Sequence, residues 1–300
     1  MSIIVFGSLN MDLVAHVPRL PQAGETLLGT NFVTVPGGKG ANQAVAAARL
    51  GAPTAMVGRV GDDGFGELLC NSLETSGVAT EAILSSQGPS GVALINVDEV
   101  GENQIVVVPG ANGTVDLTDV DRLPLDRGSS ILLMQFEIPL IAVQAAAERA
   151  KDHCVIVDPA PARADLPPEF YGLVDILTPN QTEASQLTGL KVSSVPTAME
   201  AAQMLRQRGT STVIVKLGNQ GAVVASQSEV FHVPAFPVDV VDTVAAGDAF
   251  NGGLAVALAE EKSLREAVVW ACAVAALSVM KAGAQPSMPT RDQVETFLLS

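Results

Sequence analysis

The stretch Asp242-Thr-Val-Ala-Ala-Gly-Asp-Ala-Phe-Asn-Gly-Gly253 joins a run of small residues to an apolar helix expected over Gly247–Ala259. The bare backbone N–H groups at the start of a helix bind anions. Three residues there have no side chain that would block an approaching anion: Ala245, Ala246 and Gly247. Asp248 follows in the first helical turn, and phosphoryl transfer needs this pair of features, since the donors bind the moving phosphoryl group and the carboxylate accepts the alcohol proton. Taken alone, Asp248 could equally serve to stabilise the helix dipole.

A second glycine-rich cluster, Pro36-Gly-Gly-Lys-Gly-Ala-Asn-Gln43, leads into an Ala-rich helix over Gly40–Leu50. It is not a Walker A loop, because no Gly stands five residues before Lys39 and no Ser or Thr follows it. Paired glycines allow close approach of a ligand, and Lys39 and Asn42 supply donors and an acceptor, which favours binding of a polyol. The alternative is a plain strand–helix turn with a solvated lysine.

Short apolar runs alternate with helical patterns along most of the chain, which predicts parallel strands covered by helices on both faces. The expected strands are Ile3–Phe6, Thr54–Val60, Ile131–Phe136, Val155–Asp158, Ile176–Thr178 and Val213–Leu217. The further helices are expected at Gly64–Glu74, Leu140–Ala150, Gln181–Thr188, Met199–Arg208, Leu264–Met280 and Arg291–Leu298. No linker is visible, so we expect one α/β domain over residues 1–300.

Two parts of the chain lack the intervening helices. Strands are expected at Asp12–Val17 and Glu25–Val35, and a hairpin at Gly91–Val97 and Asn103–Val108. Together they predict a small accessory sheet, over about residues 12–35 and 91–108, that stands off the main domain. Its exposed face and edges must be covered, either by a substrate or by a second copy of the chain.

Composition excludes several classes of function. The 17 Lys and Arg against 32 Asp and Glu give a net charge of −15 without any basic cluster, which excludes nucleic acid and anionic membranes as partners. The longest apolar run, Ala267–Met280, is shorter than the about 20 residues that a membrane span needs. No secretory signal is apparent, and Cys70, Cys154 and Cys272 form no C-x-x-C pair, which predicts a reducing, cytoplasmic location.

Both glycine-rich clusters match signatures of a known family, and further motifs agree with them. These motifs are Gly7–Asp12, Pro21–Thr26, Gly61–Gly66, Thr178–Glu183 and Gly283–Ser287. Over essentially its full length the chain resembles the PfkB family of sugar kinases. The resemblance implies the ribokinase-like fold, a three-layer α/β/α domain with a central, mostly parallel sheet and a small accessory β-sheet that acts as a lid and as a homodimer contact.

The resemblance also implies the residues of a sugar site. Asp248 would be the catalytic base, with Ala245, Ala246 and Gly247 as the anion hole. The expected sugar-binding residues are Asn10, Asp12, Gly38, Lys39, Gly40, Asn42 and Glu137, together with Asp248 itself. We expect Asp248 to be ionised at pH 7 without needing a raised pKa, because a loose transition state asks little of its base.

For ATP and metal ions the resemblance implies three groups of residues. ATP would contact Asn180, Lys216, Leu217, Gly218, Asn219, Gln220, Gly221, Gly247 and Cys272. Glu183 would hold Mg²⁺ through water, or else be a solvated carboxylate on a helix. A monovalent cation, K⁺, would lie among Asp242, Val244, Ser278, Lys281, Gly283 and Ser287, largely on carbonyl oxygens. Asp242 could instead cap its own turn.

Three closer motifs, Gly37–Ala44, Met134–Glu137 and Asp158–Ala162, imply D-ribose as the sugar and transfer of the γ-phosphoryl group of ATP to its 5-hydroxyl. A related kinase for another sugar, a nucleoside or a sugar phosphate is the main alternative. A phosphorylated substrate would want basic clamps, and the accessory strands offer only Arg19 nearby. A non-catalytic sugar-binding protein on the same fold is another alternative. Such a protein should have lost the base or the anion hole, and this sequence keeps both. A Rossmann dehydrogenase would need G-x-G-x-x-G after the first strand, where Gly7–Asn10 has one glycine.

Overall fold

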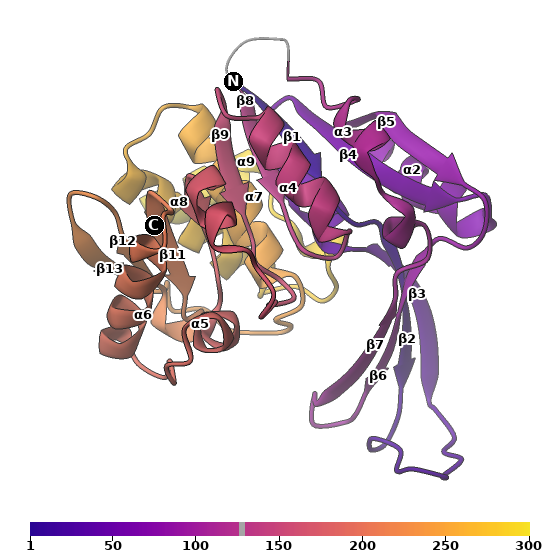
Figure 1. The fold of residues 1–300 in the computed structure, drawn as a ribbon. Helices are drawn as coiled ribbons and strands as arrows, with labels where there is room; N and C mark the ends of the chain where they lie inside the picture. Colours follow the sequence, from indigo (N-terminus) through magenta and orange to yellow (C-terminus); the bar gives the residue numbers. More distant parts are fainter. Residues whose placement is uncertain (126–129) are drawn as a thin grey trace.

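The computed structural model describes residues 1–125 and 130–300, and a nine-stranded sheet runs through the body of the molecule (Figure 1). The strand order is β13-β12-β11-β10-β9-β8-β1-β4-β5, and the pairs from β5 to β11 are parallel, whereas β12 pairs antiparallel with both neighbours. The strands are β1 (Ser2–Phe6), β4 (Thr54–Gly61), β5 (Val78–Ser86), β8 (Ser130–Met134), β9 (Cys154–Val157), β10 (Ile176–Leu177), β11 (Thr212–Lys216), β12 (Ala222–Ala225) and β13 (Val230–Val233).

Helices cover both faces of this sheet. Along β1, Ile3 and Val5 belong to a core shared with α1, α2, α7, α8 and α9, and Ile4 and Phe6 belong to a second core shared with α3 to α6. The helices are α1 (Lys39–Arg49), α2 (Gly64–Thr75), α3 (Leu117–Val120), α4 (Leu140–Arg149), α5 (Gln181–Thr188), α6 (Val195–Gln207), α7 (Ala246–Ala259), α8 (Leu264–Ser278) and α9 (Arg291–Leu299). Alternate residues of a strand face opposite sides, so two apolar faces on β1 give the predicted three layers.

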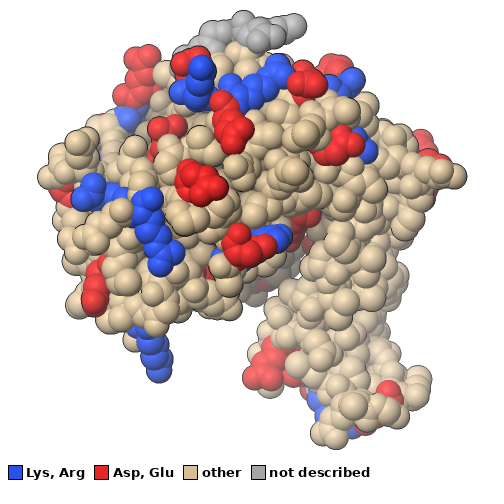
Figure 2. All heavy atoms as spheres, in the orientation of Figure 1, with Lys and Arg blue, Asp and Glu red and all other residues tan. Residues whose placement is uncertain are grey.

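A separate four-stranded sheet, which we call the lid, projects from the body beside the carboxyl end of β1 (Figure 1). Its order is β3-β2-β6-β7, with the bounds β2 (Asn10–His16), β3 (Asn31–Gly37), β6 (Gly91–Val97) and β7 (Asn103–Val108). The smaller sheet predicted from the missing helices is therefore confirmed. Figure 2 shows a recess between the lid and the body, and a lid shaft that carries few charged side chains.

Parts of the predicted secondary structure need correction. The strand expected at Glu25–Val35 begins only at Asn31, because Glu25 is tied by hydrogen bonds to Arg19 and to the backbone of Gln22 in a loop. The helix expected from Met199 begins at Val195, where Ser194 caps it. In the part of the chain that the structure describes, no helix is both long and apolar enough to cross a membrane.

Candidate active site

Asp248 lies in the first turn of α7, with only 5% of its surface exposed. Ala245, the residue before the helix, adopts a left-handed conformation with φ 59°. Asn42 Nδ2 on α1 donates to Asp248 Oδ2 at 3.0 Å, and Gln43 Nε2 donates to Asp248 Oδ1 at 2.9 Å. Both oxygens of the candidate base are thus held from the neighbouring helix, and each keeps a lone pair for a substrate hydroxyl.

The electrostatic environment of Asp248 is a balance of opposed effects. Burial is the largest effect and raises its pKa, Lys39 and the two amide donors lower it, and Asp158 raises it; together they bring the pKa of Asp248 to about 6. We expected Asp248 to be ionised at pH 7 without needing a raised pKa; its burial nevertheless raises the pKa above the ordinary value. With a pKa of about 6 the carboxylate is still mostly ionised at pH 7, as a base requires.

The predicted sugar-binding residues Asn10 and Glu137 lie together at the foot of the lid. Glu137 Oε2 accepts from Ser8 Oγ at 2.5 Å and from the backbone N–H of Lys39 at 3.3 Å, and Asn10 Nδ2 lies 3.4 Å from the same oxygen. Asn112 Nδ2 donates to Asn10 Oδ1 at 2.8 Å. Ser8 and Asn112, which the sequence analysis did not single out, therefore fix how the two binding groups point.

Asp12 is the carboxylate with the most strongly raised pKa at this end of the site. Burial and then the charges of Glu137 and Asp248 raise the pKa of Asp12 to about 7, against a smaller lowering by Lys39. For Lys39 the largest effect, burial, lowers the pKa, but the carboxylates of Asp248, Asp158 and Glu137 outweigh it and hold the pKa above its ordinary value. The site thus places one cation among several close carboxylates, which suits a polyol with many hydroxyl groups.

The glycines of the Pro36–Gln43 cluster are required by space. Gly38 has φ +89°, and a Cβ on Gly40 would lie 2.7 Å from the backbone nitrogen of Ser8. This close packing directs the start of α1 at the end of β1. Asn42 Oδ1 is buried with no partner among the described residues, so a buried acceptor next to Asp248 is left for a ligand hydroxyl.

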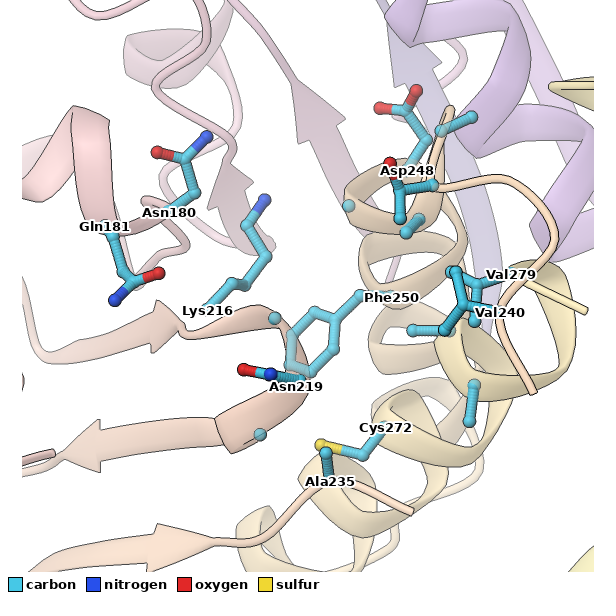
Figure 3. A pocket seen from close by; sticks show the side chains of 18 of the residues that line it. Asn180, Gln181, Lys216, Asn219, Ala235, Val240, Asp248, Phe250, Cys272 and Val279 are labelled. Carbon is cyan, nitrogen blue, oxygen red and sulfur yellow. The ribbon is translucent and has the colours of Figure 1, made fainter. Parts of the chain in front are cut away.

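Besides the predicted sugar-binding residues at the foot of the lid, Asp248 also borders a cavity of about 700 Å³. Figure 3 shows Asp248 at one end, Cys272 and Ala235 at the other, and Asn180, Gln181 and Lys216 along one wall. The far end is apolar, lined by Ala235, Phe236, Val240, Phe250, Cys272, Ala275, Ala276 and Val279. Burial raises the pKa of Cys272 to about 12, so it is a neutral thiol in this wall. A polar end beside the base and an apolar far end suit a nucleotide, with phosphates near Asp248 and the base near Cys272.

Most of the predicted ATP loop reaches this cavity. Lys216, Gly218, Asn219 and Gly221 line it, as do Asn180 and Gly247. Leu217 does not, because its side chain is buried in the core, and its N–H donates to the carbonyl of Gly221. Gln220 is also absent from the lining, and its carbonyl contacts His232 Nε2. These two residues shape the turn of the loop and do not line the cavity.

The predicted metal-binding residues are placed as follows. Asp242 accepts from the N–H of Val244 at 3.0 Å and of Gly283 at 2.8 Å, so it ties two loops together. The hydroxyls of Ser278 and Ser287 donate to carbonyls three residues earlier, and Lys281 is exposed. Glu183 forms a capping box with Asn180, whose N–H and Nδ2 it accepts at 2.7 and 2.8 Å. Burial and Asp158 raise the pKa of Glu183. Within residues 1–125 and 130–300, no cluster of three or more His, Cys, Asp or Glu side chains could hold a metal.

Asp158 and Gln43, which were not among the predicted site residues, join the sugar end of the site to the nucleotide cavity. Asp158, directly after β9, forms an ion pair with Lys216 Nζ at 2.9 Å and accepts from Gln43 Nε2 at 3.2 Å. Asp158 appeared in the sequence only within a motif, although its place after a buried strand of a parallel sheet is where site residues gather.

The known proteins that this chain resembles agree with this geometry. A pfkB family carbohydrate kinase domain matches residues 1–291. The chain is 43% identical over 301 residues to a ribokinase of Haemophilus influenzae, covering 99% of this chain and 98% of the relative. It is 37% identical over 302 residues to a deoxyribokinase of Salmonella typhimurium, covering 99% of each. A solved ribokinase of Arabidopsis thaliana, complexed with ribose and ATP, superposes with a TM-score of 0.89 at 36% identity, covering 99% of this chain and 98% of the other.

Proposed function

The chain belongs to the pfkB family of carbohydrate kinases, and from this premise we propose that it transfers the γ-phosphoryl group of ATP to the 5-hydroxyl of D-ribose, giving D-ribose 5-phosphate and ADP. The observation that carries the proposal is the position of Asp248. It stands between the polyol-binding groups at the foot of the lid and the nucleotide-sized cavity, at the N-terminus of α7. A base there can reach a sugar hydroxyl that faces the γ-phosphate.

The proposed roles follow from the contacts. Asn10, Asp12, Glu137 and Asn42 bind sugar hydroxyls, and the carboxylate of Asp248 takes the proton of the attacking hydroxyl. The hydroxyl oxygen forms a bond to the γ-phosphorus as the bond to the β,γ-bridging oxygen breaks, and ADP leaves with that oxygen. The N–H groups at residues 245–247 bind the charge on the transferred group. Lys216, held by Asp158, lies along the wall of the nucleotide cavity.

Two metal ions belong to this proposal. The donor sets fit them. Glu183 keeps free lone pairs that can reach Mg²⁺ through water, and the backbone N–H of Asp242 donates to the carbonyl of Val279, so a carbonyl oxygen of the kind that suits K⁺ lies beside Asp242. Magnesium would neutralise charge on the phosphates of ATP. The monovalent cation would order the loop before α7 and so steady the anion hole.

We also propose a cytoplasmic homodimer that forms through the lid. The exposed large apolar side chains of the lid include Phe32, Val33, Leu94, Ile105, Val106, Val107 and Val108, and Leu28 is exposed in the connection between β2 and β3. Ile105 to Val108 are consecutive in β7, so exposed apolar side chains stand on both faces of the sheet, and β7 also presents a strand edge. Exposed apolar surface of this kind is normally covered in a soluble protein.

Deoxyribose is the second candidate sugar, because a deoxyribokinase is among the relatives at 37% identity. A sugar phosphate is disfavoured, since Arg19, the one predicted basic residue near the accessory strands, is paired with Glu25.

The test is release of ADP measured with ribose, 2-deoxyribose, fructose, adenosine and fructose 6-phosphate in parallel, with the Asp248→Asn variant as the control for background hydrolysis. We expect kcat/KM for ribose to exceed every other value by at least about 10-fold, the size of one well-made hydrogen bond. A preference for 2-deoxyribose would replace the proposed sugar. No sugar-dependent ADP release from any of the five would refute the assignment of the site.

A further inference from the structure

A buried group of amide and carboxylate side chains lies behind Asp248, and Gln43 is at its centre. The Gln43 side chain is fully buried. Its Nε2 donates to Asp248 Oδ1 at 2.9 Å and to Asp158 Oδ2 at 3.2 Å. A side-chain amide nitrogen has two hydrogens, so one amide satisfies both carboxylates.

The orientation of that amide is itself fixed. Gln135 Nε2, beyond the end of β8, donates to Gln43 Oε1 at 2.5 Å. If the Gln43 amide were flipped, its oxygen would face two carboxylates and its NH₂ would face another NH₂. Gln135 is fully buried, and its amide oxygen fills the space that a side chain at Gly7 would occupy. The contacts therefore hold the NH₂ group of Gln43 toward Asp248 and Asp158.

We propose that Gln43 is a positioning residue for phosphoryl transfer, whose amide holds the carboxylate of Asp248 toward the sugar hydroxyl and ties it to the Asp158–Lys216 ion pair at the nucleotide cavity. This inference rests on the proposed role of Asp248 as the base. Gln43 touches neither substrate, and it acts through the two carboxylates that it bridges. Gln135 acts one step further back, by orienting Gln43.

Several charged groups face Asp248, and together with the amides they determine how the pKa of Asp248 changes when Gln43 is replaced. Lys39 on α1 lowers the pKa of Asp248, Asp158 after β9 raises it, and Asp12 on β2 and Asp248 repel one another. The amides of Asn42 and Gln43 lower it. Removing the Gln43 amide therefore raises the pKa of Asp248 above about 6, and removing the charge of Asp158 lowers it.

The test is the pH dependence of kcat from pH 5 to 9.5, at saturating ribose and MgATP, in Gln43→Met. Saturating ribose is needed because the titration of Asp12, with its pKa of about 7, would enter kcat/KM for ribose. Met has a similar length but no polar group at its end. The matched control is Gln203→Met, on the exposed face of α6. A hydrogen bond to a charged group corresponds to a shift of about 1 pH unit or more, so we expect the acidic limb to move up by about 1 unit. A pKa moved from about 6 to about 7 should lower kcat about 5-fold at pH 6 and about 2-fold at pH 7, and at pH 9 kcat should return close to the wild-type value.

The variant Asp158→Asn should give a shift of opposite sign. Its acidic limb should move to lower pH, whatever the substitution does to the maximal rate. A purely structural role of Gln43 would lower the rate equally at every pH. That result, or an acidic limb unmoved in a variant with wild-type thermal stability, would overturn the inference. If Gln43→Met does not fold, Gln135→Met decides the question. The Gln43 amide then loses the hydrogen bond that orients it, so the acidic limb should move to higher pH by a smaller amount. An unmoved limb refutes the proposal.

The inference and the proposed function fail in different ways. A wild-type protein without ribose-dependent ADP release refutes the function. An active wild type with unmoved limbs in the variants refutes the role of Gln43 alone. Titration of the Asp248 carboxyl carbon by NMR gives a readout that does not need turnover, and the same upward shift in Gln43→Met is expected there.

Discussion

Replacing Asp12 by Asn should make the unliganded protein more stable while it weakens sugar binding. Asp12 lies at the foot of β2, and burial together with the charges of Glu137 and Asp248 raises its pKa from 3.8 to about 7. Among the residues that the structure describes, none donates a hydrogen bond to its carboxyl group. Asn is a neutral side chain of nearly the same shape, so the substitution removes an unfavourable charge without leaving a cavity.

The size of the effect follows from the pKa shift. One pKa unit corresponds to 1.36 kcal/mol, so a shift of about 3 units sets a ceiling of about 4 kcal/mol for the cost of the charge. Relaxation of the partly exposed site reduces this, and we expect a gain of about 1–2 kcal/mol in the free energy of unfolding. The folded-state pKa lies above the unfolded one, so the native state binds more protons between about pH 4 and 7. Wild-type stability therefore falls across that window, and the loss is complete above pH 7.

Urea unfolding of wild type and Asp12→Asn, at pH 4.5 and at pH 8, measures the prediction. The gain should be about 1–2 kcal/mol at pH 8 and about a quarter of that at pH 4.5, where Asp12 is protonated in the folded state but already largely ionised in the unfolded chain. Asp152→Asn, on an exposed turn before β9, is the matched control and should show no such difference. The KM for ribose should rise about 10–100-fold, as loss of a hydrogen bond to a charged group implies. An equal ΔΔG at both pH values, or destabilisation at pH 8, would refute the reasoning.

Three further predictions concern the base, the cation and the nucleotide. Asp248→Asn should lower kcat about 10²–10⁴-fold with MgATP affinity nearly unchanged, and near-normal turnover in a folded variant would remove Asp248 from its role. K⁺ should speed turnover several-fold over tetramethylammonium at equal ionic strength, and Asp242→Ala should abolish the difference; equal wild-type rates in both salts would leave Asp242 as a loop tie only. Cys272→Leu adds bulk at the apolar end of the cavity and should raise the KM for MgATP about 10-fold with little effect on the KM for ribose. An unchanged KM for MgATP would place the nucleobase elsewhere.

Features that depend on local pattern could be predicted from the sequence. The small residues before Asp248 predicted a helix N-terminus, and the structure begins α7 at Ala246. The strands without helices at Gly91–Val97 and Asn103–Val108 predicted a separate hairpin, and β6 and β7 have these bounds. In both cases the information lies within fewer than twenty residues, and spacing alone carries it.

Features that depend on strand order could not be predicted in this way. Gln43, Gln135 and Asp158 meet behind Asp248 because β1, β8 and β9 are neighbours in one parallel sheet, which places the segments after β8 and β9 together at one edge. Nothing in the local sequence orders those strands. The raised pKa values escaped prediction for a related reason, since they depend on how deeply the assembled site is buried.

The row of residues where the lid meets the body has a consequence for protein engineering. In the lid sheet Asn10 pairs with Gly37 on one side and with Gly91 on the other. A Cβ on Gly91 would lie 2.2 Å from Asn10 Oδ1, and one on Gly37 would lie 2.4 Å from Asp12 Oδ2. Exchanging the lid between related enzymes therefore requires both chain segments to be transplanted at once, with cuts placed beyond this row. A chimera that replaces one segment alone would pair strands of different ancestry across the two side chains that we propose bind the sugar.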